Sequence, residues 1–265
     1  MQMTELGSES QPFFVTIRFY EELNDFLPIT RRKRRFSVQL RHHTTVKDLI
    51  ESCGVPHPEV DMILVNGNSC TFSYHMQSDD DVAVFPVFES LDISALTRLP
   101  RRPLRHPVFL ADCHLGKLSR YLRLLGFDVR YGLNSSDDAL ARLSADHGWI
   151  LLTRDRRLLM RRIVSKGHYL RSPSPHFQTV AVVHRFQLES LIAPFSRCLS
   201  CNGKTQRIPK NTVYNELPPM TRLNYNEFYR CTSCEKIYWA GAHQKKISGF
   251  IHWVLLKSNI EGAYA

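Results

Sequence analysis

The feature that most constrains the fold is an alternation of short apolar runs with amphipathic stretches along residues 107–196. Residues 108–111 form an apolar run, and leucines then recur at the spacing of one helix face, at Leu115, Leu118 and Leu122. Strands that alternate with helices predict a parallel sheet with helices on both faces. We therefore expect an α/β fold in this part of the chain.

The rest of this stretch repeats the pattern. Further strands are predicted over residues 127–132, 149–155 and 179–185, the last from the sequence TVAVVHR. Helices are predicted over residues 135–148 and 156–167, because polar caps and glycines bracket their leucine-rich segments. The first strand and these three predict a four-stranded parallel sheet.

Four aspartates follow the predicted strands. Asp112 ends the first strand, Asp155 ends the third, and Asp137 and Asp138 begin the helix after the second. Because strand ends and the helix starts that follow them share one edge of a parallel sheet, these carboxylates are expected to lie together. Carboxylates at one place repel unless a cation lies between them, and Mg²⁺ or Mn²⁺ is the natural occupant. Each aspartate could instead cap the helix that follows it.

Two Cys-x-x-Cys pairs lie about thirty residues apart, and they consist of Cys198 with Cys201 and Cys231 with Cys234. Four thiolates at such spacing can close a tetrahedral structural Zn²⁺ site. The alternative is two redox pairs or four unrelated thiols. The three remaining cysteines have no such partner and are expected to be ordinary buried residues: Cys53, Cys70 and Cys113.

Residues 13–89 predict a small unit of a different kind. Strands are expected at FFVTIRFY and RRFSVQLR, followed by a capped helix that ends at Gly54 and then by two more strands. This order is that of a β-grasp fold, and the unit resembles the ubiquitin-like sulfur-carrier proteins. Carrier chemistry needs a free Gly-Gly tail, whereas this strand continues into further chain. We expect a docking or RNA-contacting module.

The 265 residues carry a formal net charge of +10, with basic clusters at residues 31–35, 98–106 and 154–162. Such clusters favour an anionic partner, most commonly a nucleic acid, although they are also typical of solvated surfaces and linkers. Residues 90–106 are charged and contain prolines, and we expect a linker there. The apolar runs are too short for a membrane span and the N-terminus lacks a signal peptide's apolar core, so a cytoplasmic protein is expected.

Several of these motifs resemble those of a known family. FLADCHLGKLSRYLRLLGFDVRYG and SSDDALARLSADHGWILLTRDRRLL resemble the Mut-seven C-terminal RNase domain, a branch of the PIN-like nucleases. FSRCLSCNG and YRCTSCEKIYWAGAH resemble the zinc ribbon that accompanies this domain, over residues 197–250. The ubiquitin-like unit resembles the one fused upstream in many bacterial members. The resemblance covers roughly residues 13–250.

The resemblance implies a PIN-like fold and a metal-dependent ribonuclease. By motif, Asp112 is the first acid, Asp138 or its neighbour Asp137 the second, and Asp155 the third. Many PIN nucleases use four acids, and a fourth is not obvious here. Asp128 begins a strand at the opposite end, and we expect it to be structural.

The resemblance also gives the basic residues a role. Arginines suit phosphate geometry, so the bases nearest the acids are expected to approach the RNA backbone, although each could be a solvated surface residue. They are Arg154, Arg156, Arg157, Lys117 and Arg120. His243 follows the last cysteines with aromatic and basic neighbours and is expected near substrate, whereas Trp239 is expected in the ribbon's core. Transfer RNA is one candidate substrate; the rival interpretation is a non-catalytic RNA-binding or adaptor protein.

Overall fold

The computed structural model describes residues 12–41, 43–86, 96–99, 106–132, 136–239 and 244–261, with the side chains of 244, 245 and 259–261 excepted. The chain divides into two compact units, Met1–Arg102 and Pro103–Ala265.

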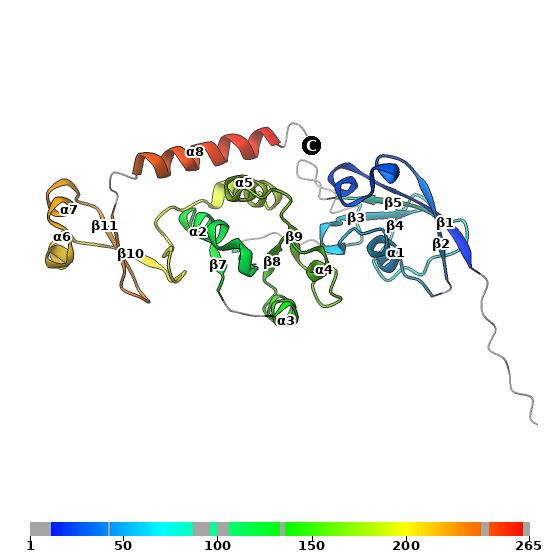
Figure 1. The fold of residues 1–265 in the computed structure, drawn as a ribbon, viewed down its shortest axis with the longest axis horizontal. Coiled ribbons are helices and arrows are strands. Elements are labelled where there is room, and N and C mark those ends of the chain that lie inside the picture. The colour runs from blue at the N-terminus through cyan, green and yellow to red at the C-terminus, as the bar shows by residue number, and fades with distance from the viewer. Residues whose placement is uncertain are drawn as a thin grey trace, which may run out of the picture. The chain divides into compact units, whose positions relative to one another are not determined.

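The first unit contains a five-stranded sheet with the order β2-β1-β5-β3-β4 (Figure 1). Its strands are β1 (Phe13–Phe19), β2 (Phe36–Leu40), β3 (Met62–Val65), β4 (Asn68–Ser69) and β5 (Asp81–Phe85). β1 pairs antiparallel with β2 and parallel with β5, which confirms the predicted β-grasp arrangement. The predicted continuation of β5 through residues 87 and 88 lies outside the described residues.

Helix α1 (Val46–Ser52) buries Val46, Leu49 and Ile50. The described residues of this unit also form three short 3-10 helices, η1 (Glu21–Phe26), η2 (Ile29–Arg31) and η3 (His57–Glu59). α1 begins with a capping box, in which Thr45 and Asp48 satisfy each other's backbone N–H groups. It ends before Gly54, whose φ of +92° is left-handed and suits glycine. The predicted capped helix is thus confirmed.

The second unit contains a four-stranded parallel sheet with the order β7-β6-β8-β9. Its strands are β6 (Val108–Ala111), β7 (Asp128–Arg130), β8 (Ile150–Thr153) and β9 (Gly167–Tyr169). The helices around it are α2 (Gly116–Leu124), α3 (Asp137–His147), α4 (Arg156–Leu159) and α5 (Pro175–Arg185), with the 3-10 helices η4 (Cys113–Leu115) and η5 (Glu189–Leu191).

Helices cover both faces of the parallel sheet, as predicted (Figure 1). Side chains alternate between the faces along each strand. Phe109 and Ala111 of β6 pack in the core formed with α2 and α5, whereas Leu110 packs in the core formed with α3 and α4. All three side chains are buried.

Two element predictions in this unit are wrong. Residues 179–185, predicted as the fourth strand, belong to helix α5, and the fourth strand is β9. Pro175 is the first residue of α5, where a missing N–H costs nothing, and the valines that favoured a strand form its buried face. The helix predicted over residues 156–167 ends at Leu159, since the chain must turn back to reach β9.

The ribbon is a three-stranded antiparallel sheet in the order β10-β11-β12. Its elements are β10 (Thr205–Ile208), α6 (Lys210–Val213), η6 (Tyr214–Glu216), α7 (Pro219–Asn224), β11 (Phe228–Cys231) and β12 (Ile237–Trp239). Val213, Leu217 and Phe228 form a small buried cluster, against which Trp239 packs. The interpretation of Trp239 as part of the ribbon's core is confirmed.

Helix α8 (Gln244–Glu261) returns from the ribbon and packs on α5 (Figure 1). Val254 enters the core beneath α2 and α5, and Phe250 and Trp253 make edge-to-face contacts with His176 at its border. Nowhere in the described part of the chain does a helix combine the length and apolar character needed to cross a membrane.

Candidate active site and metal centre

The order of the parallel strands gives the sheet a topological switch point between β6 and β8. From β6 the chain crosses by α2 to β7, and from β7 it returns by α3 to β8 on the other side of β6. β6 and β8 are therefore neighbours whose following helices α2 and α4 lie on opposite faces. In open α/β sheets, ligands bind outside the carboxyl ends of two such strands. Asp112 follows β6 there, and Thr153 ends β8.

Asp112 is held firmly at this switch point. Its backbone N–H donates to Leu152 of the neighbouring strand (3.0 Å), which continues the sheet by one residue. Its side chain is buried, with Oδ1 accepting from the Cys113 N–H (2.6 Å) and Oδ2 accepting from the Thr153 hydroxyl (2.7 Å). A carboxylate has about four lone-pair sites, so these two bonds leave acceptor capacity for a cation.

Thr153 connects Asp112 to Asp155. Its hydroxyl donates to Asp112 and accepts from the Asp155 backbone N–H at 2.9 Å. Asp155 is half-buried, and its Oδ1 accepts from the Arg157 N–H at 2.7 Å, so it caps α4. The helix-cap interpretation of Asp155 is therefore confirmed, and it leaves the second carboxylate oxygen for another role.

Asp137 and Asp138 lie in the first turn of α3 and are turned toward an arginine. Ser136 caps this helix by accepting from the Ala139 N–H (3.4 Å). Arg161, beyond the end of α4, forms an ion pair with Asp138 and reaches Asp137 at 4.0 Å. Both carboxylates are exposed.

The four aspartates do not converge on one point in this structure. Among the described residues, no three of these carboxylates offer oxygens within 4.8 Å of one another. The fold brings Asp112 and Asp155 together through Thr153 and holds Asp137 and Asp138 on Arg161.

The predicted RNA-binding arginines surround the end of β8. Arg156 lies over the ring of Tyr169, the last residue of β9, with its guanidinium carbon 5.3 Å from the ring centroid. Arg154 and Arg157 are exposed.

Of the other predicted contacts, Lys117 and Arg120 are exposed on α2, whose N-terminal turn lies next to Asp112. His243 lies outside the described residues.

The two Cys-x-x-Cys pairs do converge. Cys198 Sγ lies 3.6 Å from Cys234 Sγ, and Cys201 Sγ lies 3.4 Å from Cys231 Sγ. All four sulfurs lie within 4.8 Å of one another. Four sulfurs bound tetrahedrally at 2.3 Å from one Zn²⁺ would be about 3.8 Å apart, so the arrangement fits that ion.

Residues 107–251 match the family model of the Mut7-C RNAse domain, which is more than half of the chain. The chain belongs to the Mut7-C RNAse domain family. Residues 13–92 match the model of the Mut7-C ubiquitin domain, in agreement with the β-grasp unit. Membership indicates a ribonuclease that acts on RNA, and it confirms the family resemblance seen in the motifs.

Two solved structures are similar to part of this Mut7-C chain. One is small archaeal modifier protein 1 of H. volcanii, with 15% identity and a TM-score of 0.24, covering 29% of this chain and 99% of that chain. The other is a putative molybdopterin converting factor, subunit 1, from Pyrococcus furiosus, with 18% identity, the same TM-score and the same coverage. No curated protein matches the chain.

The pKa values of two thiols in the Mut7-C cysteine centre, Cys198 and Cys201, are shifted in opposite directions. Burial alone would raise the pKa of Cys198, but hydrogen bonds from the Cys201 N–H and the Tyr238 hydroxyl outweigh it and lower the pKa to about 6. Burial and the neighbouring thiols raise the pKa of Cys201 to about 12. Cys198 is therefore easily ionised, whereas the full set of four thiolates is disfavoured because their charges repel. A bound divalent cation would offset that repulsion.

The other cysteines of this Mut7-C chain have different environments. Cys53 and Cys70 are buried, as predicted, and burial raises the pKa of each to about 11. The same prediction is wrong for Cys113, which is exposed. Cys113 begins the turn after Asp112, beyond the end of β6, so its side chain lies outside the core.

Three residues of the Mut7-C site escaped the sequence prediction. Thr153 and Arg161 contact the aspartates, and the Tyr131 hydroxyl donates to the Cys113 carbonyl at 2.9 Å. Thr153 had a signal in the sequence, since a hydroxyl residue ends the strand directly before Arg154 and Asp155. Arg161 lies in the basic cluster of residues 154–162, but no sequence pattern indicated that it pairs with the aspartates. No pattern indicated the contact of Tyr131 either, because both contacts depend on how the elements pack.

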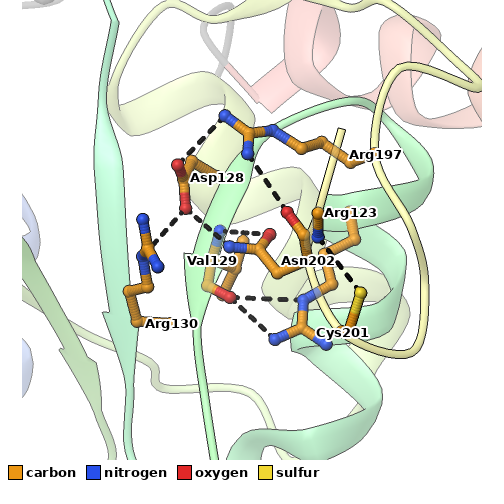
Figure 2. A network of polar contacts seen from close by, with 8 residues as sticks. Arg123, Asp128, Val129, Arg130, Arg197, Cys201 and Asn202 are labelled. Carbon is orange, nitrogen blue, oxygen red and sulfur yellow. Dashed lines mark hydrogen bonds and ion pairs between the residues drawn. The ribbon is translucent and has the colours of Figure 1, made fainter. Parts of the chain in front are cut away.

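A polar network joins β7 to the turn that carries Cys198 and Cys201, which we call the first knuckle (Figure 2). The turn that carries Cys231 and Cys234 is the second knuckle. Asp128 accepts from Asn202 Nδ2 (2.6 Å) and pairs with Arg130 (3.2 Å) and Arg197 (3.0 Å). Its carboxylate is therefore engaged at the end of the sheet opposite Asp112, in accord with the structural role predicted for it.

Proposed function

We propose that this chain is a metal-dependent ribonuclease that hydrolyses RNA phosphodiester bonds at the carboxyl edge of the parallel sheet. The observation that carries the proposal is the placement of Asp112, a buried carboxylate fixed by Thr153 and Cys113 at the switch point of the sheet. Family membership supplies the nuclease class.

Asp112 and Asp155 would hold Mg²⁺ or Mn²⁺, with Asp138, or its neighbour Asp137, as the third acid. Oxygen ligands of this kind suit both cations. A cation bound there polarises the phosphodiester and lowers the pKa of a water molecule. Arg161 offsets the charge of Asp137 and Asp138 and thereby lowers the repulsion among the acids.

The chain's basic residues would bind and orient the RNA. Arg154, Arg156 and Arg157 lie at or just beyond the end of β8, and Tyr169 fixes the guanidinium of Arg156. Lys117 and Arg120 extend this basic surface along α2. Guanidinium groups bind phosphate oxygens bidentately, which orients the backbone as well as attracting it.

The remaining assignments follow from the cysteine centre and the charge. Zn²⁺ in the four-cysteine site would have a structural role, because four protein ligands leave no open position for chemistry. Clustered free thiols fit a reducing cytoplasm. A net charge of +10 fits a structured RNA bound at several points, for which transfer RNA is our candidate.

A second function is favoured by one observation. Asp112 accepts from the first N–H of η4 and Asp155 caps α4, so capping alone accounts for both carboxylates. In that case the chain would be a non-catalytic RNA-binding or adaptor protein.

The test uses zinc-loaded protein freed of other divalent ions, because a chelator would also attack the cysteine centre. Labelled transfer RNA and an unstructured RNA are incubated with no addition, with Mg²⁺ and with Mn²⁺. Cleavage only after addition, lost in Asp112→Asn, supports the nuclease. RNA binding without cleavage under every condition supports the adaptor.

A further inference from the structure

The two Cys-x-x-Cys knuckles share one backbone turn. Asn202 follows Cys201 and donates its N–H to the Cys198 carbonyl (3.0 Å), with a left-handed φ of +67°. Glu235 follows Cys234 in the same way, donating to the Cys231 carbonyl (3.1 Å) with a φ of +58°. The two positions are geometrically equivalent.

Their side chains have opposite environments. Glu235 is exposed, whereas Asn202 is only 6% exposed and faces β7 (Figure 2). Asn202 Oδ1 accepts from the Val129 N–H at 3.0 Å, and its Nδ2 donates to Asp128. The side-chain amide thus occupies the place that a neighbouring strand would take beside β7.

Arg123 completes the arrangement from helix α2. Its Nε and Nη2 donate to the Val129 carbonyl at 3.2 and 2.8 Å. Its Nη1 donates to the carbonyls of Leu199 and Ser200, inside the first knuckle, at 3.2 and 3.1 Å. At the edge of the sheet, the Val129 N–H is therefore bonded to Asn202, which belongs to the first knuckle. The Val129 carbonyl is bonded to Arg123, which also donates to that knuckle.

We propose that the first knuckle is a zinc-dependent lock on the edge strand β7, with Asn202 and Arg123 as the residues that connect the metal centre to the nuclease sheet. An exposed edge strand needs cover, and buried N–H and C=O groups need partners. The turn that places Asn202 is held by Cys198 and Cys201, whose conformation depends on the metal they bind. Zinc binding and the order of β7 therefore stabilise each other, and the coupling is reciprocal.

The lock reaches the candidate active site through the residue after β7. The Tyr131 hydroxyl donates to the Cys113 carbonyl, and the Cys113 N–H donates to Asp112. Tyr131 also packs closely on the start of α2, since a Cβ added to Gly116 would lie 2.7 Å from the Tyr131 hydroxyl oxygen. Tyr131 is thus a positioning residue for the turn that carries Asp112, a step that rests on the proposed function.

The first experiment compares Asn202→Gly with Glu235→Gly in the full zinc-loaded chain. Glycine keeps the left-handed turn in both knuckles, so the two changes differ in what the side chain touched. We expect zinc transfer to a chromogenic chelator to be about tenfold faster in Asn202→Gly and near wild-type in Glu235→Gly, within the range of coupling between sites. Equal rates in the two variants would overturn the lock.

Hydrogen exchange of the Val129 amide gives a readout that does not depend on activity. In the wild type, removal of zinc should increase exchange at Val129 strongly and at the interior β8 strand little. Protection of Val129 that is the same with and without zinc would contradict the proposal. Asn202→Asp serves if the glycine variant fails to fold: it keeps the acceptor for Val129 but repels Asp128, and faster zinc loss is again expected.

The step to the active site is tested with Tyr131→Phe, which removes one hydroxyl and keeps the ring. Weaker Mn²⁺ binding together with a lower kcat at unchanged KM supports the positioning role. Unchanged Mn²⁺ binding and kcat would exclude it while leaving the ribonuclease intact. Absence of cleavage in the wild type would instead remove the proposed function, and zinc release and Val129 exchange would still decide the lock.

Discussion

The four-cysteine centre and the acidic edge are two sets of potential metal ligands, and the fold assembles them to different degrees. The acidic edge consists of Asp112, Asp137, Asp138 and Asp155 at the carboxyl ends of the parallel strands. The four sulfurs already lie within 4.8 Å of one another. At the acidic edge, Asp112 is fixed and buried, whereas Asp138 is exposed and paired with Arg161. Thiols can pack together while protonated, but carboxylates are charged at neutral pH and repel. A structural site can therefore be formed in advance, whereas a site of acids needs a compensating charge.

The two sets also differ in what fixes each ligand. In each knuckle, the N–H of the second cysteine points at the sulfur of the first, at 3.5 Å for both Cys201 and Cys234. The turn itself thus aims the sulfurs. Asp112 and Asp155 each cap a helix with one carboxylate oxygen, and Thr153 also donates to the second oxygen of Asp112. Each carboxylate still has lone pairs that these hydrogen bonds do not use. The acidic edge retains freedom that catalysis can use.

The strongest test of the acidic edge is Asp112→Asn. Asparagine keeps one oxygen that can accept from the Cys113 N–H, and its NH2 group can donate to the Thr153 hydroxyl, so the fold should survive, but the charged ligand is lost. We expect cleavage to fall on the order of 10²–10³-fold, since preorganised electrostatic stabilisation is removed. RNA binding should persist. Asp146→Asn, an exposed change in α3, is the matched control, and equal activity of the two variants would return Asp112 to a capping role.

The corresponding change in the cysteine centre is Cys198→Ser. Purified wild type should hold about one Zn²⁺ per chain, and the variant should hold none and lose about 4 kcal/mol or more of stability, as metal-site losses do. Metal analysis and thermal unfolding measure both effects. Cys113→Ser should keep its zinc. A wild type purified without chelator that contains no zinc would contradict the assignment.

A third comparison sets the arginines of the acidic edge against those of the ribbon. Replacing Arg156 and Arg157 with Gln should weaken RNA binding and lower the salt dependence of log K by roughly 0.7–0.9 for each phosphate that is no longer neutralised. Arg207→Gln is the control, because Arg207 is exposed and paired with Glu227 in the ribbon. Binding is measured at several salt concentrations, and an unchanged slope in the double variant would place the RNA elsewhere.

The smallest expected effect concerns Arg161. If Arg161 offsets the charge of Asp137 and Asp138, then Arg161→Gln should tighten Mn²⁺ binding by about 2–5-fold, since exposed ion pairs contribute little. Arg162→Gln, at the neighbouring exposed position, should leave the affinity unchanged. Manganese titration by electron paramagnetic resonance measures the difference, and equal affinities would separate Arg161 from the metal.

Local pattern made much of the fold predictable. The capped helix ending at Gly54 and the cysteine pairs depend on spacing along the chain, which the sequence displays directly. The placement of Asp112 and Asp155 at one edge follows from the alternation of strands and helices. These features need no knowledge of distant contacts.

The errors have a common physical origin. The valine-rich segment 179–185 has the composition of a strand, but packing against α2 and α8 makes it a helix, and β9 is only a three-residue Gly-His-Tyr segment. The ion pairs of Arg161 and the docking of Asn202 join residues distant in sequence, and no local pattern marks such contacts.

Helix α8 has a consequence for how this protein can be divided. The chain leaves the nuclease sheet, forms the ribbon, and then returns to place Val254 among the side chains beneath α2 and α5. A protein shortened at residue 196 would therefore lose part of the nuclease interior along with the ribbon. The two parts are interleaved along the sequence, so a recombination or cleavage event that separates them leaves neither with its full interior.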